Sequence, residues 1–149
     1  PDHAGLYGSA TRRNSYMGYG GTPAYVDSVA DTVVAIMIEK KGAVEELEEI
    51  LSIPGVDMVQ WGGTDYSMSI GKAGQANSAE VLDVRKKVFE MALEKGVQPR
   101  AEINTIDDAK QWLDMGVRHF SIGTDLSILH DWWKENGDGL RKAISDGIS

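Results

Sequence analysis

Acidic and glycine-rich stretches stand at four points of this sequence where a run of apolar residues ends. Such runs are typical of strands that are buried on both faces of a parallel sheet. Ligands of parallel α/β proteins gather at the carboxyl ends of the strands, so the residues after each run are candidates for a site. The four runs are followed by Glu39, by Gly62–Asp65, by Glu102 and Asn104, and by Gly123–Asp125.

The pair Glu39 and Asp65 has the composition of a site for a hard cation. The two residues follow neighbouring strands, so their carboxylates can converge at one edge of the sheet. Two oxygen ligands without a nearby Cys or His suit Mg²⁺ or Mn²⁺ and leave coordination positions for water and substrate. The backbone N–H groups of Gly63–Asp65 offer a cradle for a substrate carboxylate, because glycine lets the chain approach a ligand closely.

Each of these carboxylates also has a simpler explanation. An acidic residue after a strand can be a solvated charge or a helix cap, and this alternative stays open for Glu39 alone and for Asp65 alone. Their joint order, strand-Glu and then strand-Gly-Gly-x-Asp, favours the metal site. Glu102 is either a wall residue of a pocket or a partner for Arg100 or Arg118.

The elements that would position these residues alternate regularly between strand and helix. Apolar runs predict strands over residues 33–38, 56–61, 97–103 and 117–122. Amphipathic spacing and capping residues predict helices over 42–51, 78–95, 105–116, 126–136 and 139–144, with a short helix over 23–30. Residues 62–78 are expected to form a long loop, and Asp125 to be a first-turn charge of the helix that follows it.

Four βα units fit two architectures of the α/β class, and the opening segment decides between them. One is a small doubly wound sheet, in which residues 1–32 would be an unexplained loop. The other is half of an eight-stranded (β/α)8 TIM barrel, which normally needs roughly 250 residues. We expect the half barrel, as one domain over residues 1–149, with 1–32 as a loop and helix excursion between the halves and 33–149 as the last four βα units.

The composition narrows the class of protein further. The net charge of −8 and the pI of about 4.8 argue against a nucleic-acid partner, which needs a basic surface. The sequence has no cysteine, which excludes disulfides and thiolate zinc sites and fits the cytoplasm. No apolar run approaches the roughly 20 residues of a membrane span, so no membrane partner is expected. Because the chain begins with Pro1, its start is expected to be processed, trimmed or internal to something longer.

Several segments resemble the HpcH/HpaI aldolases, the metal-dependent class II pyruvate aldolases typified by 4-hydroxy-2-oxoheptanedioate aldolase. The stretch IMIEKKGAVEELEEILSIPGVDMVQWGGTDYSMSIG is similar to the family's strand ending in Gln-x-Glu, its next helix and its Gly-Pro-(Ala/Ser)-Asp-Leu-Ser turn. GVRHFSIGTDLSIL resembles the family's last strand with its Val-Gly-x-Asp turn, and GLYGSATRRNSY resembles its Gly-x-Arg-Gly segment. The likeness runs along essentially the whole chain and covers the second half of a family member.

The resemblance implies a metal site and a substrate class. Glu39 and Asp65 would hold a divalent ion, Mg²⁺ or Mn²⁺, with Co²⁺ or Zn²⁺ as substitutes. Pyruvate, or the keto-acid end of the substrate, would chelate that ion, which would act as a Lewis acid and stabilise the enolate. The backbone at Thr64 and Asp65 would hold the substrate carboxylate. The substrate-binding candidates are Met37, Gly63, Thr64, Asp65 and Glu102.

The sequence departs from the family pattern at several positions. Met37 stands where the family has a substrate-contacting Gln and cannot form a comparable hydrogen bond. The other replacements are Gly63-Thr64 for Pro-(Ala/Ser), Tyr66 for Leu, and Tyr7 for Arg. The family's catalytic His and Arg lie in the first half, outside this chain, so the catalytic residues are unknown. His3, His119 and His130 match neither position; we expect His119 to be structural within a strand and His130 to lie on a helix surface.

The leading hypothesis is a divalent-metal-dependent lyase that acts on a 4-hydroxy-2-oxo acid and releases pyruvate, or a similar 2-oxo acid, with an aldehyde. Glu102, Asn104 and Tyr66 are expected at the rim that contacts the distal part of the substrate. Glu102 would favour hydroxyls over a second carboxylate, because like charges repel.

Two other functions remain, and the partner of the protein is a further expectation. One alternative is a non-catalytic relative that binds metal and keto acid, which Met37 and Tyr7 favour; the other is a stand-alone flavodoxin-like domain.

Family members are typically oligomers of the hexamer type, whose C-terminal helices pack across subunits. The segment LSILHDWWKENGDGL, with Trp132 and Trp133, could form such an interface, although a Trp on a helix more often belongs to a core.

Overall fold

The computed structural model describes residues 22–147, and the chain divides into two compact units, Pro1–Val34 and Ala35–Ser149. The described part of the first unit contains α1 (Pro23–Ala30). The side chain of Thr22 accepts a hydrogen bond from the backbone N–H of Tyr25 at 3.3 Å, which closes the first turn of α1. The predicted short helix is therefore confirmed. Tyr7 and His3 lie outside the described residues.

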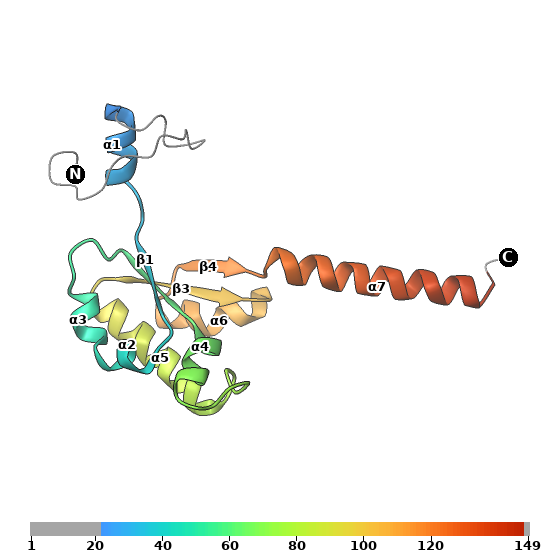
Figure 1. The fold of residues 1–149 in the computed structure, drawn as a ribbon. Coiled ribbons are helices and arrows are strands. Elements are labelled where there is room, and N and C mark those ends of the chain that lie inside the picture. The colour runs from blue at the N-terminus through green and yellow to red at the C-terminus, as the bar shows by residue number, and fades with distance from the viewer. Residues whose placement is uncertain (1–21, 148–149) are drawn as a thin grey trace. The chain divides into compact units, whose positions relative to one another are not determined.

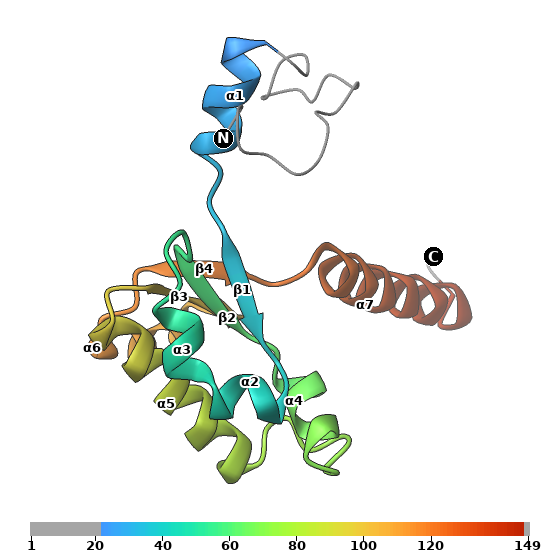
Figure 2. The same ribbon diagram turned by 60° about the vertical axis from the view of Figure 1, so that its left-hand side comes forward.

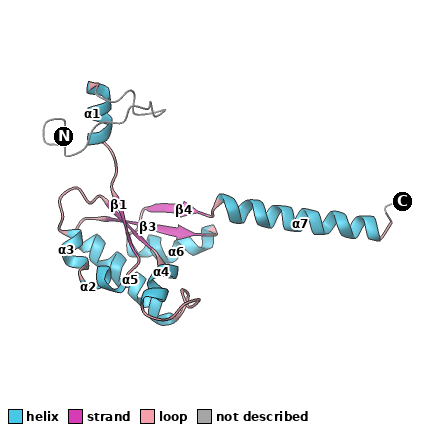
Figure 3. Cartoon of the chain, viewed as in Figure 1, coloured by secondary structure: helices cyan, strands magenta, loops and turns pink. Residues whose placement is uncertain are grey.

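The second unit is built on a four-stranded parallel sheet (Figure 1, Figure 3). Its strands are β1 (Ala35–Ile38), β2 (Met58–Trp61), β3 (Gln98–Ile103) and β4 (His119–Ile122). The spatial order is β1-β2-β3-β4, so each strand pairs with the one that precedes it in the sequence. All four predicted strands are confirmed, each with a start one or two residues later. The doubly wound alternative is wrong, because its strand order reverses at a switch point.

Helices cover one face of this sheet, as Figure 2 shows. They are α2 (Lys41–Glu45), α3 (Leu47–Leu51), α5 (Ala79–Glu94) and α6 (Ile106–Met115). Between sheet and helices lies the core, where Phe89 of α5 meets Trp112 of α6 edge-on at 5.2 Å between ring centroids. The residues that each strand contributes to this core are apolar, which is what a sheet covered on that side requires.

Successive residues of each strand point to opposite faces, and this alternation separates apolar from polar side chains. Ile38, Val59 and Ala101 face the helices and are at most 2% exposed. The opposite face, here called the open face, carries Met37, Gln60, Arg100, Glu102, His119 and Ser121. Polar residues within strands are thus explained by a face that the described helices do not cover.

The predicted loop over residues 62–78 is wrong in its first half, which forms α4 (Gly63–Ser69). The reason is tertiary packing: Tyr66 turns inward, is 7% exposed, and lies 4.7 Å from the ring of Trp61. The Ser67 side chain is fully buried and donates to the carbonyl of Thr64 at 2.8 Å. This glycine-containing stretch is therefore helical because the Tyr66 side chain packs against Trp61 of β2.

The predicted boundaries of other helices are partly right. Gly96 and Gly116 end α5 and α6 in left-handed conformation, with φ of 78° and 109°, as expected. The predicted helix over 42–51 is instead two short helices, since Glu46 leaves helical geometry at φ −100° and ψ 16°.

The two predicted closing helices are one continuous helix, α7 (Asp125–Ser145). The predicted gap at residues 137–138 is wrong: Gly137 lies within α7 and does not adopt a positive φ. Glycine within a helix costs only about 1 kcal/mol, so it weakens a long helix without ending it. Asp125 is in the first turn, as predicted. No helix within residues 22–147 has the length and apolar character needed to cross a membrane.

The first turn of α6 depends on the carboxylate of Asp108. Its Oδ2 accepts hydrogen bonds from the backbone N–H of Thr105 at 2.9 Å, from the Thr105 hydroxyl at 2.9 Å, and from the backbone N–H of Asn104 at 3.2 Å. These bonds favour the ionised form, so they hold the pKa of Asp108 below its ordinary value of 3.8. Asp108 therefore contributes stability above that pH, and the contribution is lost as pH falls through its folded pKa.

We expect Asp108→Asn to lower the melting temperature near neutral pH, and the difference from wild type to shrink as the pH falls below 3.8, the ordinary pKa of an aspartate. Thermal melts across this range measure the difference. Asp107→Asn is the matched control, because Asp107 is in the same turn without these three bonds. A difference that stays constant at every pH would contradict the role given to the Asp108 charge.

Candidate metal and substrate site

The carboxylates of Glu39 and Asp65 converge at the carboxyl ends of β1 and β2. Glu39 follows β1, and Asp65 lies in the first turn of α4. The ammonium of Lys40 lies between them, 3.1 Å from Asp65 Oδ1 and 3.9 Å from Glu39 Oε1. Both side chains are partly exposed, 33% for Glu39 and 46% for Asp65, so an ion can reach them. The structure therefore brings the predicted pair together, with the ammonium of Lys40 as the shared partner.

Gly62 permits the close approach of this pair. A Cβ added at Gly62 would lie 2.5 Å from Glu39 Cβ and 3.0 Å from Glu39 Oε2. The backbone N–H of Gly62 also donates to the carbonyl of Ile38 at 3.0 Å, which holds the ends of β1 and β2 together. Glycine is needed here for space rather than for a positive φ, because its φ is −102°.

The two carboxylates fit a divalent ion. They supply hard oxygen donors, and both already contact the positive charge of Lys40. No group of three or more His, Cys, Asp or Glu residues is gathered anywhere in the described part of the chain. An ion held by Glu39 and Asp65 would thus complete its coordination with water and substrate oxygens.

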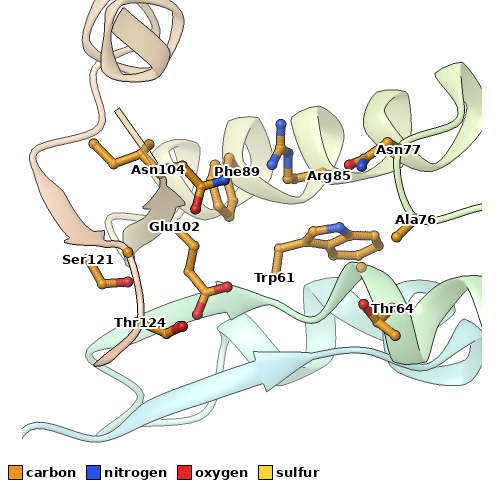
Figure 4. Close-up of a pocket in the computed structure, with 13 residues that line it drawn as sticks. Trp61, Thr64, Ala76, Asn77, Arg85, Phe89, Glu102, Asn104, Ser121 and Thr124 are labelled. Atoms are coloured by element: carbon orange, nitrogen blue, oxygen red, sulfur yellow. The ribbon is translucent and has the colours of Figure 1, made fainter. Parts of the chain in front are cut away.

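A pocket of about 370 Å³ lies near the same end of the sheet (Figure 4). It is bounded by the carboxyl ends of β2, β3 and β4 and by α5. The lining residues are Trp61, Gly63, Thr64, Ala76, Asn77, Arg85, Phe89, Glu102, Ile103, Asn104, Ser121, Gly123 and Thr124. Gly63 and Thr64 connect the pocket to the carboxylate pair, because they directly follow Gly62 and precede Asp65.

The structure distributes the predicted site residues between two places. Four of them line the pocket: Gly63, Thr64, Glu102 and Asn104. Met37 is 47% exposed on the open face, and its sulfur would lie 3.2 Å from a Cβ at Gly62, beside Glu39. Tyr66 was expected at the rim, and this is wrong, since its ring is buried against Trp61.

The side chain that contacts Glu102 is neither of the two arginines considered from the sequence. Gln60 Nε2 donates to Glu102 Oε1 at 2.6 Å, and Arg100 Nη1 donates to Gln60 Oε1. Arg118 instead donates to the carbonyls of Leu113 at 3.0 Å and Val117 at 2.8 Å. His119 lies in β4 as predicted, on the open face, and His130 lies exposed on α7.

Arg85 is a pocket residue that sequence reasoning missed. Its guanidinium lies over the ring of Trp112, 4.3 Å from the ring centroid, and burial lowers its pKa. Its Nε has no hydrogen-bond partner among the described residues. The pocket therefore has one cationic side chain on α5 and one anionic side chain, Glu102, on β3.

Comparisons with known proteins place the chain in a family. A model of the HpcH/HpaI aldolase/citrate lyase family matches residues 7–131. The hydroxypyruvate/pyruvate aldolase of Delftia acidovorans is 30% identical over 137 residues, which cover 87% of this chain and 48% of that protein. The 4-hydroxy-2-oxo-heptane-1,7-dioate aldolase of Escherichia coli is 31% identical over 123 residues, which cover 82% and 46%. The chain spans about half the length of these curated relatives.

Solved structures bear out the fold. An HpcH/HpaI aldolase/citrate lyase family protein from Burkholderia cenocepacia has a TM-score of 0.70 and 24% identity, over 87% of this chain and 52% of that one. Together with the parallel order of the four βα units, this confirms the prediction that the chain supplies the last units of a TIM barrel. With a family model that matches most of its length, the chain belongs to the HpcH/HpaI aldolase/citrate lyase family.

Proposed function

We propose that the protein is a divalent-metal-dependent lyase that cleaves or forms a carbon–carbon bond in a 4-hydroxy-2-oxo acid. Pyruvate or a similar 2-oxo acid, and an aldehyde, are the other side of the reaction. The observation that carries the proposal is the convergence of Glu39 and Asp65 on the ammonium of Lys40, next to Gly63 and Thr64, which line the pocket. The names of the relatives, two of them aldolases for 2-oxo acids, support this substrate class.

The residues of the chain have separate roles in this proposal. Glu39 and Asp65 would hold the ion, Mg²⁺ or Mn²⁺, with Co²⁺ or Zn²⁺ as substitutes. When bound, the ion supplies Lewis-acid chemistry to the 2-oxo group. The backbone N–H groups of Thr64 and Asp65 would hold the substrate carboxylate, because N–H groups in the first turn of a helix have no acceptor within it. The full-length protein should release pyruvate from a 4-hydroxy-2-oxo acid when Mn²⁺ is present. This release should stop when EDTA removes the ion.

A second candidate is a relative that binds metal and keto acid without turnover. Met37 favours it, since its thioether stands beside Glu39 and offers no hydrogen-bond donor to a substrate. Exchange of the pyruvate methyl hydrogens with deuterium separates the two functions. The enzyme should catalyse this exchange in the presence of Mn²⁺, whereas a pure binding protein would take up Mn²⁺ and leave the hydrogens in place.

We also propose that the protein is a cytoplasmic homo-oligomer in which α7 packs against another copy. None of the residues of α7 is buried. Large apolar side chains recur along it at helical spacing, and they are 53–78% exposed. These residues are Leu126, Ile128, Leu129, Trp132, Trp133, Leu140 and Ile144. An apolar surface of this kind marks an interface with protein more often than a surface kept in water.

Trp133→Glu is expected to reduce the molar mass in solution to that of smaller species, because it introduces a charge in the centre of the apolar stripe. Size-exclusion chromatography with light scattering measures the mass. Glu135→Lys changes a charge on the same helix two residues away and should leave the mass unchanged. Wild-type protein that is already monomeric, or an unchanged mass for Trp133→Glu, would contradict the proposal.

A further inference from the structure

Three polar side chains form a row across the open face of the sheet, beside the pocket. Arg100 Nη1 donates to Oε1 of Gln60, and Nε2 of Gln60 donates to Oε1 of Glu102 at 2.6 Å. Gln60 lies opposite Arg100 in the β2–β3 register, and Glu102 is two residues further along β3, on the same face. Gln60 is the buried member of the row, with 7% of its surface exposed.

The charges on either side fix the orientation of the Gln60 amide. The guanidinium has only donors, so it must face the amide oxygen, and the carboxylate has only acceptors, so it must face the amide nitrogen. A flipped amide would place donor against donor and acceptor against acceptor. Within the described residues, neither Arg100 nor Glu102 forms an ion pair. Gln60 therefore keeps the two charges apart and links them through hydrogen bonds to charged groups, which are the stronger kind.

This arrangement presents Glu102 to the pocket. Figure 4 shows its carboxylate between Ser121 and Thr124 on one side and Trp61 and Thr64 on the other. All four of these neighbours are uncharged. Glu102 Oε2 has no hydrogen-bond partner in the part of the chain that the structure describes. The free oxygen can accept a hydrogen bond from a ligand in the pocket.

We propose that Gln60 is a positioning residue that holds Glu102 as the acceptor for a substrate hydroxyl. The pocket would then take 2-oxo acids whose distal end carries hydroxyl groups, in preference to those that end in a second carboxylate. A hydroxyl can donate to Oε2, whereas a carboxylate meets a like charge there. This inference rests on the proposed function, because it requires the 2-oxo end of the substrate to be held at Glu39 and Asp65.

The test compares two aldehydes of similar size in Mn²⁺-dependent aldol addition to pyruvate: glyceraldehyde, which carries hydroxyls, and succinic semialdehyde, which carries a carboxylate. The wild-type protein should prefer glyceraldehyde by roughly 10-fold or more in kcat/KM. Gln60→Met replaces the amide by a side chain of similar volume, with no hydrogen-bond donor and only a weakly accepting sulfur. It should reduce this preference by about 10-fold, through the KM for glyceraldehyde, because Arg100 and Glu102 can then pair directly and withdraw the acceptor.

Glu102→Gln tests the same contact from the other side. It should lower the preference to a similar extent, and the double variant should lower it no further, since both changes act on one hydrogen bond. Glu102 has an exposed side chain, so this variant decides the question even where Gln60→Met fails to fold. Gln98→Met is the matched control for Gln60→Met, because it makes the same replacement on the neighbouring strand. Gln98 lies on β3, two residues before Arg100, and is not part of the row or of the pocket lining.

Deuterium exchange of the pyruvate methyl hydrogens separates the inference from the function on which it rests, because this exchange needs no aldehyde. A wild-type protein with neither exchange nor addition overturns the proposed function and the inference with it. If the wild-type protein catalyses the exchange but Gln60→Met and Glu102→Gln leave the aldehyde preference unchanged, the role of the row is overturned and the proposed function stands. A wild-type preference for succinic semialdehyde also overturns it and would point to Arg85 as the residue that contacts the distal end.

Discussion

Glu39→Gln is expected to weaken Mn²⁺ binding by about 100-fold or more and to lower pyruvate release by about 1,000-fold. The amide keeps the size and shape of the carboxylate but has no charge. Asp65 would be left as the one carboxylate of the pair, so the ion would lose half of the anionic ligands that the chain offers it at this site. Titration calorimetry with Mn²⁺ and an assay coupled to pyruvate give the two numbers.

The interpretation of this variant depends on its fold remaining intact. Glu39 is partly exposed and its removal leaves no buried polar group behind, so the melting temperature in EDTA should change little. Glu45→Gln is the matched control, because Glu45 is in the helix that follows and forms only an exposed pair with Lys41. Unchanged Mn²⁺ affinity in Glu39→Gln would show that the ion, if one binds, is held elsewhere.

The strands could be predicted from the sequence because each is a short apolar run followed by a turn. The run from Val33 to Ile38 continues without interruption, which is typical of a parallel strand covered on both faces in a complete barrel. The helix ends at Gly96 and Gly116 could be predicted for a local reason, since both positions need the left-handed conformation that glycine adopts easily. Both kinds of signal are contained within a few consecutive residues.

The missed features depend on contacts between distant residues. The helical state of α4 follows from the packing of Tyr66 on Trp61, which no local pattern indicates. The row on the open face needs the register that places Gln60 opposite Arg100. Period-two alternation could have placed Arg100 and Glu102 on one face, but not their partner on β2. Arg85 was missed because a lone arginine in an amphipathic helix is usually on its solvated side.

Gly62→Ala is the second variant for which we expect a large effect. The new Cβ would lie 2.5 Å from Glu39 Cβ, well inside the distance of about 3.5–4.0 Å at which carbon atoms normally pack. The backbone at Glu39 cannot move away easily, because the hydrogen bond from Gly62 N–H to the Ile38 carbonyl holds the ends of β1 and β2 together at this point. We expect a loss of about 1–3 kcal/mol in the free energy of unfolding and weaker Mn²⁺ binding, as Glu39 is displaced from Asp65.

Gly42→Ala provides the control that makes this result specific to the site. A Cβ at Gly42 meets no atom within 4 Å, and the residue lies within α2 without a positive φ. Alanine there should be neutral or raise the free energy of unfolding by up to about 1 kcal/mol, because it is the better helix former. Denaturant melts of the two variants, with and without Mn²⁺, give the comparison. If Gly62→Ala were as stable and bound Mn²⁺ as tightly as Gly42→Ala, the close approach of β1 and β2 would not be what holds the two carboxylates together.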